Sequence, residues 1–154
     1  MIFFTDEKYQ NDTAWIEYEK YIRSIWKDLP YDLRMIHEGM LPEELFDKAK
    51  SVSLHDARIT NYYFDKKLSV LSVVLNTDYE GNLRKAFFEY YGAKIIQDVS
   101  PNRKGLGLDD YHSDIMCHEL TKDEEDNFQH AIIFCSGEEF ILRFSCFKMK
   151  YEDI

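Results

Sequence analysis

The sequence contains few of the features that mark disulfide-rich, membrane-spanning or secreted proteins. Its three cysteines, Cys117, Cys135 and Cys146, form no CxxC pair and cannot all join in disulfides, so we expect each thiol to act as a small apolar side chain. No apolar run approaches the roughly 20 residues of a membrane-spanning helix. The first residues have neither the basic flank nor the long apolar region of a signal peptide. These absences predict a soluble, reduced, cytoplasmic protein.

Positive charge is also in short supply. The 19 lysines and arginines are outnumbered by 29 aspartates and glutamates, which gives a formal net charge of −10. A surface with this charge repels phosphate groups, so we expect neither nucleic acid nor an anionic membrane as a partner, whereas a basic protein surface would be attracted. Acidity that only keeps the protein in solution is the alternative.

Aromatic residues, in contrast, are abundant. The chain has 11 Tyr and 11 Phe, and large rings bury much area for little loss of rotamer freedom, which favours a packed β-rich core over disorder. A length of 154 residues is that of a single domain, and no repeat or long linker divides it. We therefore predict one domain over residues 1–154.

The pattern of apolar residues predicts helices first and strands afterwards. Apolar residues recur at helical spacing from Thr13 to Lys27, and shorter helices are predicted over 31–37 and 42–50. We predict an α+β fold in which helices from residues 1–53 pack on one side of a mostly antiparallel sheet of about six or seven strands within 54–154. The strands are expected at 59–64, 68–75, 83–91, 93–99, 110–120, 127–135 and 139–150.

One of these strands, 68–75, has apolar residues at both odd and even positions. A strand of this kind is typical of a sheet that is covered on both faces, so we expect it to lie centrally and to be buried on both sides. Asp65-Lys66 predicts the short hairpin turn that precedes it.

One predicted hairpin suggests a metal site. Its first strand, 110–120, carries two histidines and an aspartate on one face. If Leu120 pairs with Phe128, His118 lies directly opposite His130, with Cβ atoms about 5 Å apart and rings close enough to share a metal ion. A slip of one residue would place His130 on the other face, and histidines that face solvent or are satisfied in the core are the alternative. The candidate ligands are His112, Asp114, His118 and His130.

A second pair, His55 and Asp56, stands where the helical part gives way to the sheet. The carboxylate could orient the imidazole as a general base. Adjacent residues of an extended chain point to opposite faces, however, which favours a turn role for Asp56 and a partly buried ring for His55. No GxSxG, HExxH or P-loop pattern is present, the acidic run 123–126 lacks the alternating ligands and the glycine of a calcium loop, and no cofactor is predicted.

Several segments together resemble a known bacterial family. They are Leu54-His-Asp-Ala-Arg-Ile, Leu68–Leu75, Asp110-Tyr-His-Ser-Asp-Ile, Phe128-Gln-His-Ala-Ile-Ile-Phe134 and the closing Glu139–Tyr151. With the opening Phe-Phe-Thr and Leu29-Pro30, they resemble domain-of-unknown-function family 4085 over the whole chain. This resemblance supports the fold and implies no particular activity. The His-Asp-Ala entry into the first strand also resembles immunity proteins of bacterial polymorphic-toxin systems.

These observations favour a non-catalytic protein-binding module. An immunity protein that docks on the basic groove of a toxin nuclease would use an acidic surface and exposed tyrosines as anchors. Two alternatives stay open: a small metal-binding protein or hydrolase that uses His118 and His130, and a structural or regulatory module without a ligand. A monomer and a homodimer are both compatible with the sequence. The candidate contact residues are His55, Asp56, Tyr62 and Tyr111.

Overall fold

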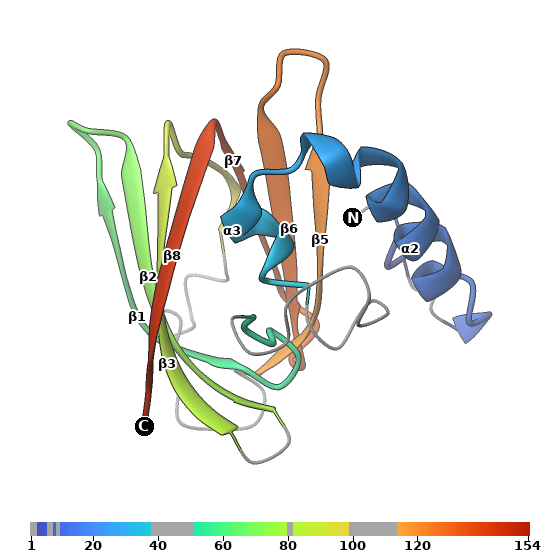
Figure 1. Cartoon of the computed structure of the whole chain (residues 1–154), viewed down its shortest axis with the longest axis horizontal. Helices are drawn as coiled ribbons and strands as arrows, with labels where there is room; N and C mark the ends of the chain where they lie inside the picture. Colours follow the sequence, from blue (N-terminus) through green and yellow to red (C-terminus); the bar gives the residue numbers. More distant parts are fainter. Residues whose placement is uncertain (1–2, 6–7, 9, 38–50, 80–81, 99–113) are drawn as a thin grey trace.

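The computed structural model describes residues 3–5, 8, 10–37, 51–79, 82–98 and 114–154, which form a short helical part followed by strands (Figure 1). The helical elements are α2 (Ala14–Ile25), the 3-10 helix η1 (Trp26–Asp28) and α3 (Tyr31–Arg34). The strands are β1 (Arg58–Asp65), β2 (Val70–Tyr79), β3 (Asn82–Tyr91), β4 (Lys94–Gln97), β5 (Ile115–Lys122), β6 (Phe128–Phe134), β7 (Glu139–Phe144) and β8 (Cys146–Asp153).

The predicted first helix is confirmed as α2 and η1. Tyr18 and Ile22, four residues apart, are fully buried, whereas Lys20 and Arg23 face solvent, as expected of an amphipathic helix. The helical run ends before Pro30, and α3 follows at once but is shorter than the predicted 31–37. The predicted helix 42–50 lies outside the described residues. No helix in the described ranges is long and apolar enough to cross a bilayer.

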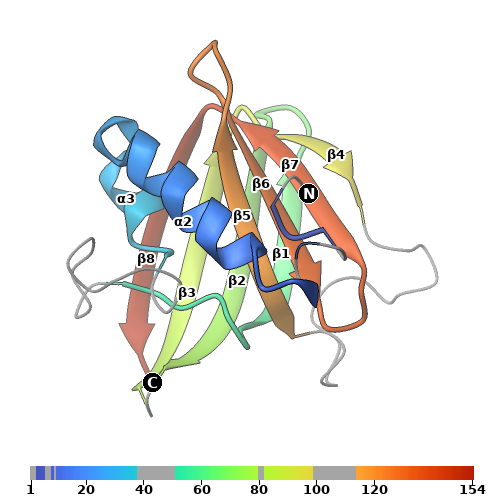
Figure 2. The ribbon, with the colours of Figure 1, turned by 90° about the vertical axis from the view of Figure 1, so that its right-hand side faces the viewer.

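The strands form two antiparallel sheets, which confirms the predicted α+β fold with antiparallel pairing. Sheet A has the order β1-β2-β3-β8, and sheet B has the order β4-β7-β6-β5. The sheets face one another, so the apolar inner face of each is covered by the other sheet, while the helices lie beside β5 and β8 (Figures 1 and 2). The layers therefore differ from the expected single sheet under a helical cover.

Two strands run through both sheets by bending at a shared corner. β3 passes into β4 through Gly92, and β7 passes into β8 through Ser145. The backbone N–H of Ser145 donates to the carbonyl of Tyr91 at 2.9 Å, which joins the two bends. Gly92 has a φ of +64°, and a Cβ atom there would lie 2.6 Å from Ser145 Oγ. The predicted strand 139–150 is therefore divided into two at this corner, which we call the Gly92 corner.

Strand β2 is central in sheet A but is buried on one face only. Leu71 and Leu75 are buried between the sheets, whereas Val74 is half-buried on the outer face and Leu68, in the preceding turn, is 71% exposed. Val74 pairs with Phe87 of β3. The expected burial on both sides is wrong, because the outward valines pack against cross-strand rings and not beneath another layer.

The three cysteines are free. Cys117 is buried in sheet B, and burial raises the pKa of its thiol to about 12, with nearby Glu119 adding to the shift. Cys135 is half-buried, and Cys146 is exposed on β8.

The helical part satisfies the backbone of the strand edges that it covers. The hydroxyl oxygen of Tyr18 accepts the N–H of Leu120 at 2.7 Å, and the hydroxyl oxygen of Tyr21 accepts the N–H of Lys122 at 2.8 Å. Both amides belong to β5, an edge strand of sheet B. An unpaired strand edge is a template for adding another strand, so these hydroxyls block that surface.

Two further sets of backbone contacts hold the edge strands β8 and β5. Asp32 of α3 accepts the N–H of Met149 on β8 at 3.0 Å. The start of β5 is held by the segment before β1, because Asp56 N–H donates to Ile115 O and Ile115 N–H donates to Ala57 O. The two sheets are thus linked at the Gly92 corner and again where β5 meets this segment.

Candidate functional site

The structure brings His118 and His130 together in the core, but in a different register from the expected one. Leu120 pairs with His130, and His118 pairs with Ile132, so the expected pairing of Leu120 with Phe128 is wrong by two residues. A shift of two leaves both rings on the same inner face of sheet B. The rings are therefore diagonal neighbours, with His118 Nδ1 at 2.9 Å from His130 Nε2.

The pair extends across the core to sheet A. His130 Nδ1 lies 2.9 Å from the hydroxyl of Tyr90 on β3, and all three side chains are buried. The other nitrogen of His118, Nε2, is buried without a hydrogen-bond partner. A line of hydrogen bonds thus connects the two sheets and ends at an unsatisfied ring nitrogen.

A third buried histidine, His37, reaches this line from the helical part. Its Nδ1 donates to the carbonyl of Leu33 at 2.8 Å, so in the neutral ring Nε2 accepts the hydroxyl proton of Tyr18 at 2.9 Å. Tyr18 in turn accepts from Leu120. The ring centroids of His37 and His118 are 5.4 Å apart. We call His37, His118, His130, Tyr18 and Tyr90 the histidine network.

The interior keeps these histidines uncharged. Burial lowers the pKa of His37 to about 4 and, together with nearby His37, lowers the pKa of His130 to about 3. Burial and the adjacent rings lower the pKa of His118 well below its usual value, while the carbonyl of Ile36 opposes the shift. Burial also raises the pKa of the Tyr90 hydroxyl. At neutral pH the network is a set of neutral hydrogen-bonded rings.

The four predicted metal ligands are described only in part, since His112 lies outside the described residues. Asp114 forms an ion pair with Arg58, with 2.6 Å between Oδ1 and Nε, and lines a polar pocket of about 380 Å³. His118 and His130 direct their facing nitrogens at each other, which leaves no shared lone pairs for an ion. Within the described ranges, no group of three or more His, Cys, Asp or Glu is arranged to hold a metal ion.

His55 and Asp56 face each other because the chain turns here. Asp56 has a φ of +63°, which brings its Oδ2 to 3.6 Å from His55 Nε2. His55 Nδ1 lies 2.8 Å from the carbonyl of Met116, to which it donates. The expectation of opposite faces and a partly buried ring is wrong, since both side chains are exposed. Of the predicted tyrosines, Tyr62 is half-buried on the inner side of β1, and Tyr111 lies outside the described residues.

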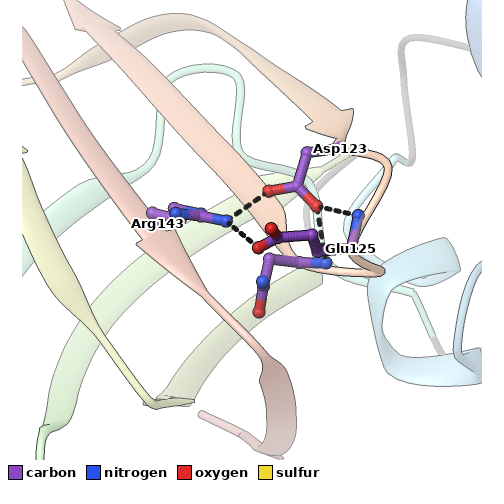
Figure 3. A network of polar contacts seen from close by, with 4 residues as sticks. Asp123, Glu125 and Arg143 are labelled. Carbon is purple, nitrogen blue, oxygen red and sulfur yellow. Dashed lines mark hydrogen bonds and ion pairs between the residues drawn. The ribbon is translucent and has the colours of Figure 1, made fainter.

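The acidic run 123–126 is the hairpin tip between β5 and β6, and its carboxylates form contacts within the hairpin and with β7. Asp123 accepts the N–H groups of Glu125 and Asn127, and Arg143 of β7 reaches Asp123 at 2.7 Å and Glu125 at 3.2 Å (Figure 3). This arrangement is a closed turn with a local counter-ion.

The outer face of sheet A is a surface that sequence analysis did not single out. Cross-strand pairs place Val70 beside Tyr91 and Val74 beside Phe87. Lys85 and Lys150 lie over the ring of Phe87 at 5.7 and 5.5 Å, and no described helix or strand covers this side (Figures 1 and 2). The spacing of alternate lysines on a strand was the available signal. We call it the outer A face; it consists of Tyr63, Val70, Val74, Lys85, Phe87, Glu89, Tyr91, Lys148, Lys150 and Glu152.

The resemblances to family 4085 and to immunity proteins stay predictions. The chain matches no family model, no curated protein and no solved structure.

Proposed function

We propose that the chain is a cytoplasmic, non-catalytic protein-binding module, of the immunity type or a related class, that contacts its partner through the outer A face. The observation that carries this proposal is the row of rings and valines, crossed by lysine side chains, on a sheet face that none of the described helices or strands covers. Aromatic side chains surrounded by polar ones are typical of the energetic centre of protein interfaces.

The buried position of the chemically versatile residues supports the same proposal. The rings of His118 and His130 are committed to the interior hydrogen-bond line. His55 is exposed, but its Nδ1 already donates to a backbone carbonyl. The outer A face, in contrast, presents Tyr63, Lys148 and Lys150 to solvent beside half-buried rings and valines.

The local charge of the outer A face indicates the chemistry of the partner. Lys85, Lys148 and Lys150 lie around the middle of the face, where they outnumber Glu89 and Glu152, whereas Asp65 and Asp78 lie at its ends. We therefore propose a partner surface that presents carboxylates around an apolar centre, in place of the basic surface that net charge alone predicts. Tyr63, which is 67% exposed at one side of the face, is the proposed anchor.

Substituting the anchor tests this proposal. The partner captured from native lysate at low salt by the wild-type chain is titrated with Tyr63→Ser, and we expect binding roughly 30-fold weaker, the loss of a hot-spot residue of about 2 kcal/mol. Lys148→Glu should also weaken binding, because it places a like charge against the partner's carboxylates. Isothermal calorimetry or surface plasmon resonance gives the affinities.

A matched control is available on the helical side. Tyr31 of α3 is 52% exposed and belongs to no part of the outer A face, so Tyr31→Ser should bind as the wild type does. Equal losses for the two tyrosine variants, or no partner captured by the wild-type chain, would refute the proposal.

A further inference from the structure

Three histidines from three separate elements meet in the core. The buried carboxylate that follows His118, Glu119, accepts the backbone N–H groups of Phe3 and Phe4. His37 follows α3, His118 belongs to β5 and His130 belongs to β6, with ring centroids 5.4 and 5.0 Å apart. The titratable groups that face them are Tyr18 from α2 and Tyr90 from β3. Among the described residues, no carboxylate forms a hydrogen bond or ion pair with these three rings.

An additional proton on one of these rings would disturb the hydrogen bonds of the network. A protonated His37 would present two N–H donors, but Tyr18 already accepts from Leu120 and would have to reorient. His118 Nε2 makes no hydrogen bond, and the carbonyl of Ile36 is the backbone acceptor beside this ring. Charges on His37 and His118 would also repel each other across the contact between the helical part and the sandwich, in a medium that screens poorly.

We propose that the helical layer, residues 14–37, is a proton-sensitive cover of the β5 edge. Protonation of His37 and His118 separates the layer from sheet B and withdraws the hydroxyls that occupy the N–H groups of Leu120 and Lys122. The two N–H groups of the uncovered edge then lose their hydrogen-bond partners. This edge is distinct from the outer A face, so the inference does not depend on the proposed function.

The sign of the effect follows from the direction of the pKa shifts. In the closed state the pKa of His37 is lowered to about 4 and that of His118 is also lowered, whereas an exposed histidine titrates near 6.5. The closed state therefore binds fewer protons than the open state between these values. The closed state is therefore favoured above about pH 6.5. As the pH falls below this value, the ratio of closed to open molecules falls by up to tenfold per pH unit for each histidine released, or by about 100-fold per pH unit for two.

The two tryptophans report on the helical layer alone. The chain has two, Trp15 in α2 and Trp26 in η1, so the wavelength of tryptophan emission measures exposure of this layer, while far-ultraviolet circular dichroism near 215 nm measures the sheets. On titration from pH 8 to 4.5 we expect a red shift that begins below pH 6.5, takes up about two protons per molecule and precedes the loss of the sheet signal.

Two variants separate this mechanism from general acid unfolding. His37→Gln can still donate to Leu33 and accept from Tyr18 but cannot take a charge, so the proton uptake should fall from about two to one. His55→Gln, which changes an exposed histidine, should titrate as the wild type does. A wild-type emission wavelength that is constant to pH 4.5, coincident loss of both signals, or identical titration of His37→Gln and wild type would overturn the proposal.

Hydrogen exchange of the wild-type chain provides a measurement that needs no variant. After correction for the intrinsic pH dependence of exchange, the amides of Leu120 and Lys122 should lose protection at pH 5, while the amides of the central strand β6 keep theirs. Unchanged protection at Leu120 and Lys122 would also overturn the proposal.

Discussion

Replacing Tyr18 with Phe is expected to lower the free energy of unfolding by about 2 to 6 kcal/mol, because two buried groups each lose a partner worth roughly 1 to 3 kcal/mol. The hydroxyl of Tyr18 accepts from Leu120 N–H and donates to His37 Nε2, and all of these groups are buried. The ring itself is retained, so packing changes little. Urea denaturation at pH 7.5, followed by circular dichroism, measures the difference.

Tyr21→Phe is the matched control for this substitution. Tyr21 also lies on α2 and also accepts a β5 amide, that of Lys122, but the site is only partly buried and a single group loses its partner. We expect a loss of about 1 kcal/mol or less, since water can replace the hydroxyl. Equal losses for the two variants would show that burial of the Tyr18 site adds nothing to the stability that its hydroxyl provides.

Replacing Gly92 with Ala should destabilise the protein by about 2 to 3 kcal/mol. A side chain in the left-handed region costs roughly 1 to 2 kcal/mol, and the new Cβ would displace Ser145 Oγ, whose hydrogen bond to the Tyr91 carbonyl is worth about 1 kcal/mol. That bond is 3.1 Å long and lies at the Gly92 corner. Thermal and urea unfolding give the stability difference.

Gly137 separates the two contributions to this loss. It has a φ of +89° in the β6–β7 turn, but nothing lies within 4 Å of the Cβ position, so Gly137→Ala should show the backbone term alone. Adding Ser145→Ala to Gly92→Ala should remove the steric term, so that the double variant is less destabilised than the sum of the two single changes. Simple additivity would contradict the close approach at the corner.

The parts of this fold that depend on local sequence patterns could be predicted from the sequence. Tyr18 and Ile22 repeat at helical spacing, and the turns around Asp65 and Gly137 separate strands that alternate correctly, so the helices, the hairpins and the antiparallel pairing could be predicted. The division into two sheets could not be predicted, because a glycine or serine between two strand patterns is equally typical of an ordinary turn, and so Gly92 and Ser145 do not indicate a bend between sheets. The prediction that β2 is buried on both faces was wrong because outward apolar residues such as Val74 pack against cross-strand rings such as Phe87, which partly bury them without a covering layer.

The candidate sites show the same limit. Alternation along the strands was enough to predict that His118 and His130 share a face. Their hydrogen bond depends on the exact strand register, and a shift of two residues leaves the alternation of faces unchanged, so the sequence pattern cannot reveal it. His37 reaches the same place from 81 positions before His118, and only the docking of α2 and α3 brings it there. His55 and Asp56 face each other because Asp56 has a left-handed backbone conformation, which a His-Asp sequence does not predict.

The Gly92 corner determines where the molecule can open. Because two continuous strands pass through both sheets there, separating the sheets on that side would require both strands to straighten together while their mutual pairing is broken. Large-amplitude breathing is therefore confined to the margin formed by β5, the helices and the segment before β1, where side-chain contacts and a few backbone bonds hold the layers. One side of the sandwich is therefore held together by continuous strands and the other can separate, so its slow opening motions occur on the side of β5 and the helices.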